Sequence, residues 1–138
     1  MTGGPGFDAG SEPVPEGTED GMRVRREVLG DAHVDRATAA ATSFTAEFQD
    51  FITRYAWGEI WTRPGLDRRS RSMITLTALV AGGHWGELAM HVRAALRNGL
   101  TVDELREVLL QTAIYCSVPS ANHAFAIAQD VLREEGLL

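Results

Sequence analysis

The 138-residue chain contains no lysine, and its 13 basic residues are all arginine. Without a lysine amine the chain cannot form a Schiff base with a carbonyl substrate or hold pyridoxal phosphate covalently. The single cysteine, Cys116, excludes an intrachain disulfide and a Cys-x-x-Cys redox pair. No segment approaches the roughly 18 consecutive apolar residues of a membrane span, and no basic and apolar secretory signal opens the chain. We therefore expect a cytoplasmic protein with no membrane partner.

The composition fits one ordinary globular domain, with 44% hydrophobic and 23% charged residues. A net charge of −6 argues against nucleic acid as a partner, because nucleic-acid binding needs a basic surface. Arginine offers a planar fork of donors that suits carboxylate groups. The charges therefore favour a small acidic ligand over a nucleic acid.

The N-terminal segment is rich in glycine, proline and acidic residues, so we expect residues 1–20 to form a disordered tail. The remaining residues, 21–138, then form a single helical domain. Asp20 is placed to cap a short helix that runs through Val28 and stops at Gly30.

Periodic apolar residues and turn signals divide this domain into helices. Asp35 is expected to cap a longer helix with apolar residues at helical spacing, namely Phe44, Phe48, Phe51, Ile52 and Tyr55. An aromatic, turn-rich connection follows over residues 57–65. Asp67 is expected to cap a helix that runs through Val80 and is ended by Gly82–Gly83, and the next helix is expected to end at Asn98–Gly99. A capping box at Thr101–Glu104 opens the helix after that. Pro119 stands in the first turn of the last helix, which ends at Gly136. Since no segment alternates like a strand, we predict an all-α fold of five to six helices.

One predicted helix carries His84, Glu87 and His91, whose offsets of three and seven place them on one side. Imidazoles and carboxylates exchange protons near neutral pH, so this face is the best candidate for chemistry. The same spacing would let the three side chains converge on a metal ion. It lacks the His-Glu-x-x-His pattern that identifies zinc sites, and we expect no metal.

Three stretches resemble the 4-carboxymuconolactone decarboxylases: WTRPGLDRR from Trp61, ELAMHVRAALRNG from Glu87 and YCSVPSANHAF from Tyr115. The resemblance covers about residues 22–135. It implies the helical fold of the wider alkylhydroperoxidase D superfamily, whose members are typically oligomeric, so we expect a homo-oligomer such as a trimer or hexamer. The dithiol motif of the peroxidases falls on His84, Glu87 and His91, and its two cysteines are absent. Peroxidase activity is therefore not expected.

The resemblance implies decarboxylation of 4-carboxymuconolactone to 3-oxoadipate enol-lactone and CO2, in the protocatechuate branch of the β-ketoadipate pathway. The substrate is a small dicarboxylate lactone. Electrons left by the departing CO2 can flow through the ring double bond onto the lactone carbonyl. The substrate is its own electron sink, and we expect no cofactor.

We assign candidate roles on this basis. His91 is the expected proton donor, with Glu87 one turn before it raising the imidazole pKa and keeping it protonated near pH 7. Substrate-binding candidates are Arg63 and Arg71 for the carboxylates, His123 as a donor, His84 as a pocket-lining residue, and Trp61 with Trp57 as apolar walls. Arg68 and Arg69 are expected to be solvated, unless the pocket of a neighbouring subunit recruits them. His33 falls in a predicted loop and is not selected.

Two other interpretations stay open. The chain could be a decarboxylase or lactone-processing enzyme of the same family that acts on another acid. It could also be a non-catalytic helical ligand-binding module. Aligned titratable residues on one helix face argue against the second only statistically.

Overall fold

The computed structural model describes residues 14–138, and over these residues every regular element is helical. The elements are α1 (Thr18–Leu29), α2 (Asp31–Ala40), α3 (Ala46–Ile52), the π-helix η1 (Thr53–Ile60), α4 (Arg68–Gly82), α5 (Trp85–Arg97), α6 (Val102–Tyr115) and α7 (Val118–Glu134). The predicted all-α class is confirmed, whereas the expected number of helices is too low. In the part of the chain that the structure describes, no helix is both long and apolar enough to cross a membrane.

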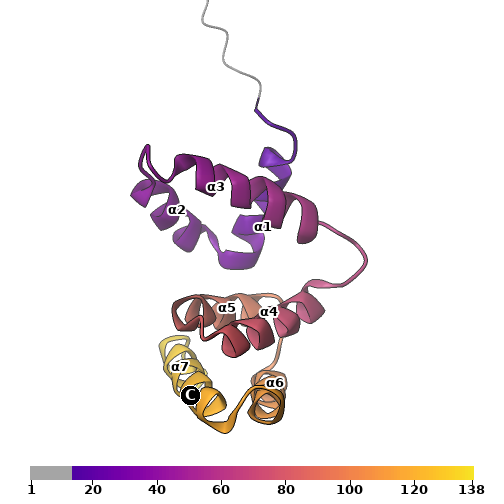
Figure 1. Cartoon of the computed structure of the whole chain (residues 1–138), viewed down its shortest axis with the longest axis vertical. Coiled ribbons are helices and arrows are strands. Elements are labelled where there is room, and N and C mark those ends of the chain that lie inside the picture. The colour runs from indigo at the N-terminus through magenta and orange to yellow at the C-terminus, as the bar shows by residue number, and fades with distance from the viewer. Residues whose placement is uncertain (1–13) are drawn as a thin grey trace, which may run out of the picture.

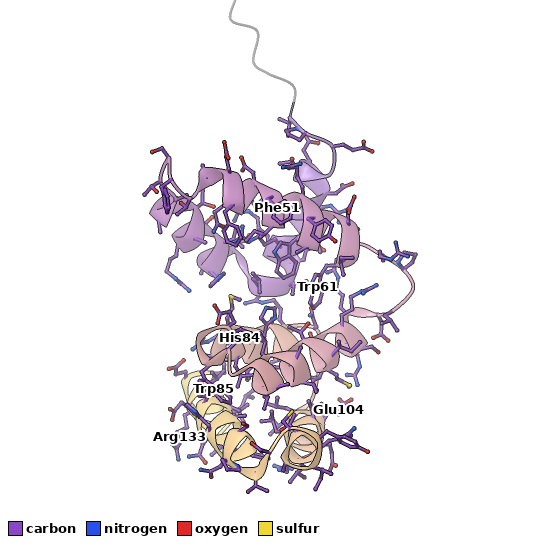
Figure 2. The ribbon with its side chains drawn as sticks, in the orientation of Figure 1. Phe51, Trp61, His84, Trp85, Glu104 and Arg133 are labelled. Atoms are coloured by element: carbon purple, nitrogen blue, oxygen red, sulfur yellow. The ribbon has the colours of Figure 1, made fainter. Side chains whose placement is uncertain are left out.

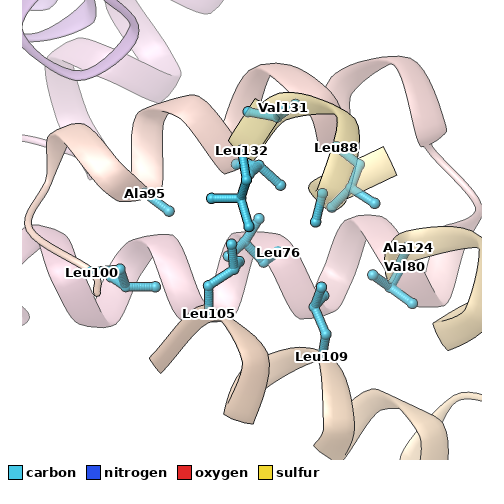
Figure 3. Packing of buried hydrophobic residues seen from close by; sticks show 12 residues of the cluster. Leu76, Val80, Leu88, Ala95, Leu100, Leu105, Leu109, Ala124, Val131 and Leu132 are labelled. Atoms are coloured by element: carbon cyan, nitrogen blue, oxygen red, sulfur yellow. The ribbon is translucent and has the colours of Figure 1, made fainter. Parts of the chain in front are cut away.

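The helices form three layers, with α4 and α5 in the middle (Figure 1). Helices α1, α2 and α3 lie on one side of this pair, and α6 and α7 lie on the other (Figure 1). One apolar core joins α4, α5, α6 and α7 around the fully buried Leu76, Leu88 and Leu109 (Figure 3). A second core joins the N-terminal helices to α5 through Val28, Trp57 and other residues. Helix α5 therefore contributes to both cores, and its candidate face lies at the boundary between layers.

Helix α1 and the π-helix η1 approach each other closely. A Cβ atom added at Gly21 would lie 2.1 Å from the carbonyl oxygen of Thr53, and one added at Gly58 would lie 2.7 Å from that of Gly17. Only glycine permits such backbone contact. The close approach fixes the position of η1, which carries Trp57.

The helix expected from Asp35 onwards is interrupted, and this break accounts for an additional helix. Helix α2 already begins at Asp31, directly after Gly30 with φ 89°, and it ends at Ala40, where Ala41 turns to an extended conformation. The amide of Thr42 then donates to Oγ1 of Thr45 at 2.9 Å, a local bond that competes with helical pairing. The expected single helix is therefore wrong.

The aromatic residues of that segment lie on the outside of the molecule. Phe44, Phe48 and Phe51 are 94%, 60% and 51% exposed. The predicted connection over residues 57–65 begins as the π-helix and becomes a turn only after Ile60. Helical spacing therefore identified helical residues from Phe48 onwards but not their buried face, and Phe44 lies in the turn before α3.

The later boundaries are confirmed. The Asp67 side chain caps α4 by accepting from the Ser70 amide at 2.7 Å, and Thr101 and Glu104 form the predicted capping box. The left-handed glycines that end α4 and α5 and the first-turn proline of α7 also stand where predicted. Of the predicted tail, residues 1–13 lie outside the described residues, and residues 18–20 belong to α1.

Candidate functional site

His91 lies on α5, half-buried against two tryptophans from the π-helix segment. Its ring centroid is 6.5 Å from that of Trp57 and 6.5 Å from that of Trp61, with planes 9° and 22° from parallel. The two indoles stack on each other at 5.2 Å. Figure 2 shows Trp61 on the side of the N-terminal helices that faces α5. The three rings form one aromatic cluster at the boundary between layers, with two apolar walls beside an imidazole.

The π-helix explains how both indoles reach this cluster. The amide of Trp61 donates to the carbonyl of Ala56 at 3.1 Å, a bond that spans five residues. The wider turn changes the angular spacing of the side chains, and such turns occur often at functional sites. The sequence pattern of residues 57–65 indicated aromatic turns and gave no sign of this geometry.

His91 is neutral at pH 7, which corrects the expectation that Glu87 keeps it protonated. Burial is the main cause that lowers the pKa of His91 to about 4, and the charge of His33 lowers it further. The charge of Glu87 raises the pKa less than these two effects lower it, because Glu87 is exposed to solvent. The Nδ1 atom of His91 is buried and has no hydrogen-bond partner among the described residues.

His33 is a neighbour of His91 that the sequence analysis missed. The predicted loop around it is helix α2, which begins at once after Gly30. Burial and the charges of Arg25, Arg36 and Arg93 lower the pKa of His33. The freedom of glycine to adopt a positive φ at position 30 was the available signal, since it allows two helices to meet without a loop.

Neither His84 nor His123 makes a ring contact with the aromatic cluster in the described part of the chain. His84 is the exposed N-cap of α5, and its ring lies so close to Gly82 that an added Cβ would be 2.6 Å from Nε2. The ring of His123 lies 4.3 Å from that of Trp85. Over residues 14–138, no three His, Cys, Asp or Glu side chains are grouped as a metal site requires.

Arg63 and Arg71 are brought together after the aromatic segment. Nη2 of Arg71 donates to the backbone carbonyl of Arg63 at 3.2 Å, while the buried Nε of Arg71 has no partner among the described residues. Arg68 and Arg69 keep 37% and 41% of their side chains exposed, in line with the expectation that they are solvated, and both also tie helices together. Arg68 bonds Glu27 at 2.7 Å, and Arg69 bonds Glu104 and the carbonyl of Gly99.

Comparison with known proteins gives the family. The profile of the Carboxymuconolactone decarboxylase family matches residues 46–130. The chain is 44% identical over 119 residues to a 4-carboxymuconolactone decarboxylase of Acinetobacter baylyi, covering 86% of this chain and 89% of that protein. It is 42% identical over 116 residues to a nitrosuccinic acid decarboxylase of Metarhizium robertsii, covering 84% and 81%. A 4-carboxymuconolactone decarboxylase of Pseudomonas putida is 59% identical over 39 residues, which cover 28% of this chain and 81% of that protein. The chain belongs to the carboxymuconolactone decarboxylase family.

Proposed function

We propose that this protein is a carboxy-lyase that converts 4-carboxymuconolactone into 3-oxoadipate enol-lactone and CO2 without a cofactor. The observation that carries the proposal is His91 on the boundary between layers, walled by Trp57 and Trp61 and with a buried ring nitrogen that has no partner in the described chain. The relatives named for this reaction support the choice of substrate.

The reaction places three demands on the protein. It must hold a dianion, stabilise the negative charge that moves onto the lactone oxygen when CO2 leaves, and return one proton to the ring. Each positioned hydrogen-bond donor stabilises the negative charge that develops on the lactone oxygen by roughly 3–4 kcal/mol. A general acid that returns the proton to the ring typically raises the rate by a factor of about 10²–10⁴. Each turnover takes up one proton from solvent, because a carboxylate leaves as neutral CO2.

In this proposal His91 takes its proton when the substrate binds. The neutral imidazole of the free protein meets two carboxylates in a site where water is partly excluded. Opposite charge at short range favours the imidazolium and raises its pKa. The imidazolium then donates its proton to the carbanion equivalent that remains after CO2 has left. Glu87, exposed one turn away, relays the next proton from solvent to His91.

Arg63 and Arg71 remain candidates for substrate carboxylates, because the Nε proton of Arg71 lacks an acceptor in the described chain. Trp57 and Trp61 keep the reacting carboxylate in a poorly solvated place, which favours the more dispersed charge of the transition state. His84 and His123 make no ring contact with this cluster in the described residues, and their role in substrate binding stays a prediction.

We further propose that the protein is a homo-oligomer, a trimer or a hexamer. An apolar groove of about 640 Å³ lies between α4 and α6 and is lined by residues that include Met73, Ile74, Val108 and Tyr115. Beside it, Ile114 is 78% exposed. Large exposed apolar patches mark interaction surfaces, and a second copy of the chain is the proposed occupant.

Nitrosuccinate is the second candidate substrate, because a similarly close relative is named for it. The decisive experiment measures CO2 release by the purified protein from 4-carboxymuconolactone and from nitrosuccinate under the same conditions. We expect kcat/KM to be at least 100-fold higher for the lactone. The opposite preference would favour the second candidate, and no release from either acid would leave a binding module as the better description.

A further inference from the structure

Arg25 is a buried arginine of α1 that contacts the start of the π-helix. It is 6% exposed and donates to Oγ1 of Thr53 at 3.2 Å and to Oε1 of Gln49 at 3.1 Å. Both of these acceptors are neutral. A buried charge without an ionised partner is unfavourable, and an apolar side chain of similar size is often no less stable at such a place. Stability of the fold alone therefore does not explain an arginine at position 25.

Thr53, the first residue of η1, is held by α1 through both its side chain and its backbone. Its hydroxyl accepts from Arg25, and its carbonyl oxygen lies so close to α1 that a Cβ added at Gly21 would be 2.1 Å away. Gly21 and Arg25 are four residues apart and therefore lie on the same face of α1. This face fixes the start of the π-helix at two points.

The helix changes from α to π at Thr53. The carbonyl of Gln49 accepts both the amide and the hydroxyl of Thr53, the hydroxyl at 2.8 Å. A threonine hydroxyl that bonds back to the carbonyl four residues earlier weakens and bends an α-helix. Because Oγ1 of Thr53 accepts from Arg25, its proton is directed to the Gln49 carbonyl. The guanidinium therefore orients the hydroxyl at the point where the wider turn begins.

The wider turn decides where the two indoles lie. Trp57 and Trp61 follow Thr53 at intervals of four residues, and the bond from the Trp61 amide to the Ala56 carbonyl spans five. A π-turn holds about one residue more than an α-turn, so its loss would rotate the following side chains by about 100° around the helix axis. Such a rotation would move the indoles away from His91, whose ring centroid lies 6.5 Å from each of theirs.

We propose that Arg25 is a positioning residue of the candidate site, which holds η1 through Thr53 in the geometry that places Trp57 and Trp61 against His91. Arg25 acts through Thr53 and not on the reacting atoms. Because burial in the aromatic cluster is the main cause that lowers the pKa of His91, the position of η1 also sets the proton affinity of that ring. The inference rests on the proposed function for the reaction that this geometry serves, and not for the geometry itself.

The test compares Arg25→Met with the matched control Arg23→Met, and Thr53→Val with Thr53→Ser. Arg23 lies on the exposed side of α1 and pairs with carboxylates at the surface. Valine has the shape of threonine without the hydroxyl, whereas serine keeps the hydroxyl. The second pair therefore tests the same hydrogen bond from its other end.

Two of the measurements need no substrate. The stacked indoles give an exciton signal in circular dichroism, and Trp61→Phe identifies this signal by removing it. The pKa of His91 is followed by NMR titration. Thermal unfolding, and the kcat and KM for CO2 release from 4-carboxymuconolactone, are recorded for every variant.

We expect Arg25→Met to fold with an unchanged or higher Tm, because an apolar side chain replaces a buried charge. Its exciton signal should be lost. The pKa of His91 should rise from about 4 to about 5 or above, since the ring regains contact with water. The kcat should fall about tenfold or more while KM changes less, because the geometry of the site is altered and the groups that bind the substrate stay.

Thr53→Val should repeat the changes in the exciton signal and in the pKa of His91, and it decides the question if Arg25→Met does not fold. Thr53→Ser should keep the exciton signal and the pKa of the parent. Arg23→Met should keep both of these and the parent's kcat as well.

A folded Arg25→Met variant that keeps the exciton signal, the His91 pKa and the kcat of the parent overturns the proposal. A lower Tm with these three quantities unchanged identifies Arg25 as a purely structural residue and also overturns it. If Arg25→Met loses the exciton signal and raises the pKa of His91, but the parent releases no CO2 from the lactone, the positioning role stands and the substrate proposed above fails.

Discussion

The imidazole of His91 and the indole of Trp57 lie nearly parallel, with planes 9° apart and ring centroids separated by 6.5 Å. Trp57 is 6% exposed and belongs to the core that joins α1, η1 and α5. The candidate acid His91 therefore packs against a residue of this core. Burial in this cluster sets the proton affinity of His91 more strongly than its exposed neighbour Glu87 does. We therefore expect the charge on His91 to change when an anionic substrate enters the site.

The first prediction concerns the pKa of His91 in the free and the occupied protein. NMR titration of the free protein should give a value of about 4 for this ring, identified by its loss in His91→Gln. Because the substrate dianion favours the imidazolium, the pKa seen in kcat should lie above the pKa seen in kcat/KM, with activity falling as pH rises through each. Equal values in the two profiles would contradict proton uptake on binding.

The second prediction is a loss of stability in acid. In the unfolded chain His91 has a pKa near 6.5, and in the fold it is about 4, so only the unfolded state takes up the proton between these values. The free energy of unfolding should fall by up to about 3 kcal/mol between pH 6.5 and pH 4 from this residue. Chemical denaturation across this window should show a smaller pH dependence for His91→Gln than for the parent. A control without a titratable group, Thr38→Ala on the exposed side of α2, should keep the parent's slope.

The third prediction tests the contact that positions η1. A methyl group at Gly21 meets the Thr53 carbonyl, and backbone cannot move aside cheaply, so Gly21→Ala should destabilise the protein by about 2 kcal/mol or more. Gly86→Ala, on α5, adds a methyl group with nothing within 4 Å and should leave stability unchanged or raise it by up to about 1 kcal/mol. Equal Tm values for the two variants would show that α1 and η1 can separate without cost.

The fourth prediction concerns self-association through the groove between α4 and α6. Ile114→Arg places a charge on an exposed apolar residue beside that groove and should convert the oligomer to a monomer in sedimentation velocity experiments. Thr38→Arg adds the same charge to exposed α2 and should keep the parent's size. A parent that sediments as a monomer, or an Ile114→Arg variant that keeps the parent's size, would place any assembly elsewhere.

The sequence predicted the second half of the fold better than the first, for a physical reason. The boundaries from Asp67 onwards depend on caps and glycines, which act within a few residues, and the structure confirms them. The break after Ala40 and the π-helix depend on the balance between local threonine bonds and packing on α1. The spacing of apolar residues in the sequence contains no information about that balance.

The same distinction applies to the site. The spacing of Glu87 and His91 predicted a shared face, but the pKa of His91 depends on burial by residues distant in sequence. His33 was missed as a neighbour of His91 because their proximity arises from the packing of helices distant in sequence. Arg63 and Arg71 do lie in contact, and their role in binding stays a prediction.

The central claim is that His91 supplies the proton in a decarboxylation. Its most direct test is the rate of CO2 release from 4-carboxymuconolactone by His91→Gln beside the parent, with circular dichroism to confirm the fold. We predict a kcat lower by about 10²–10⁴, the usual contribution of a general acid. A folded His91→Gln variant that releases CO2 at the parent's rate would contradict this account.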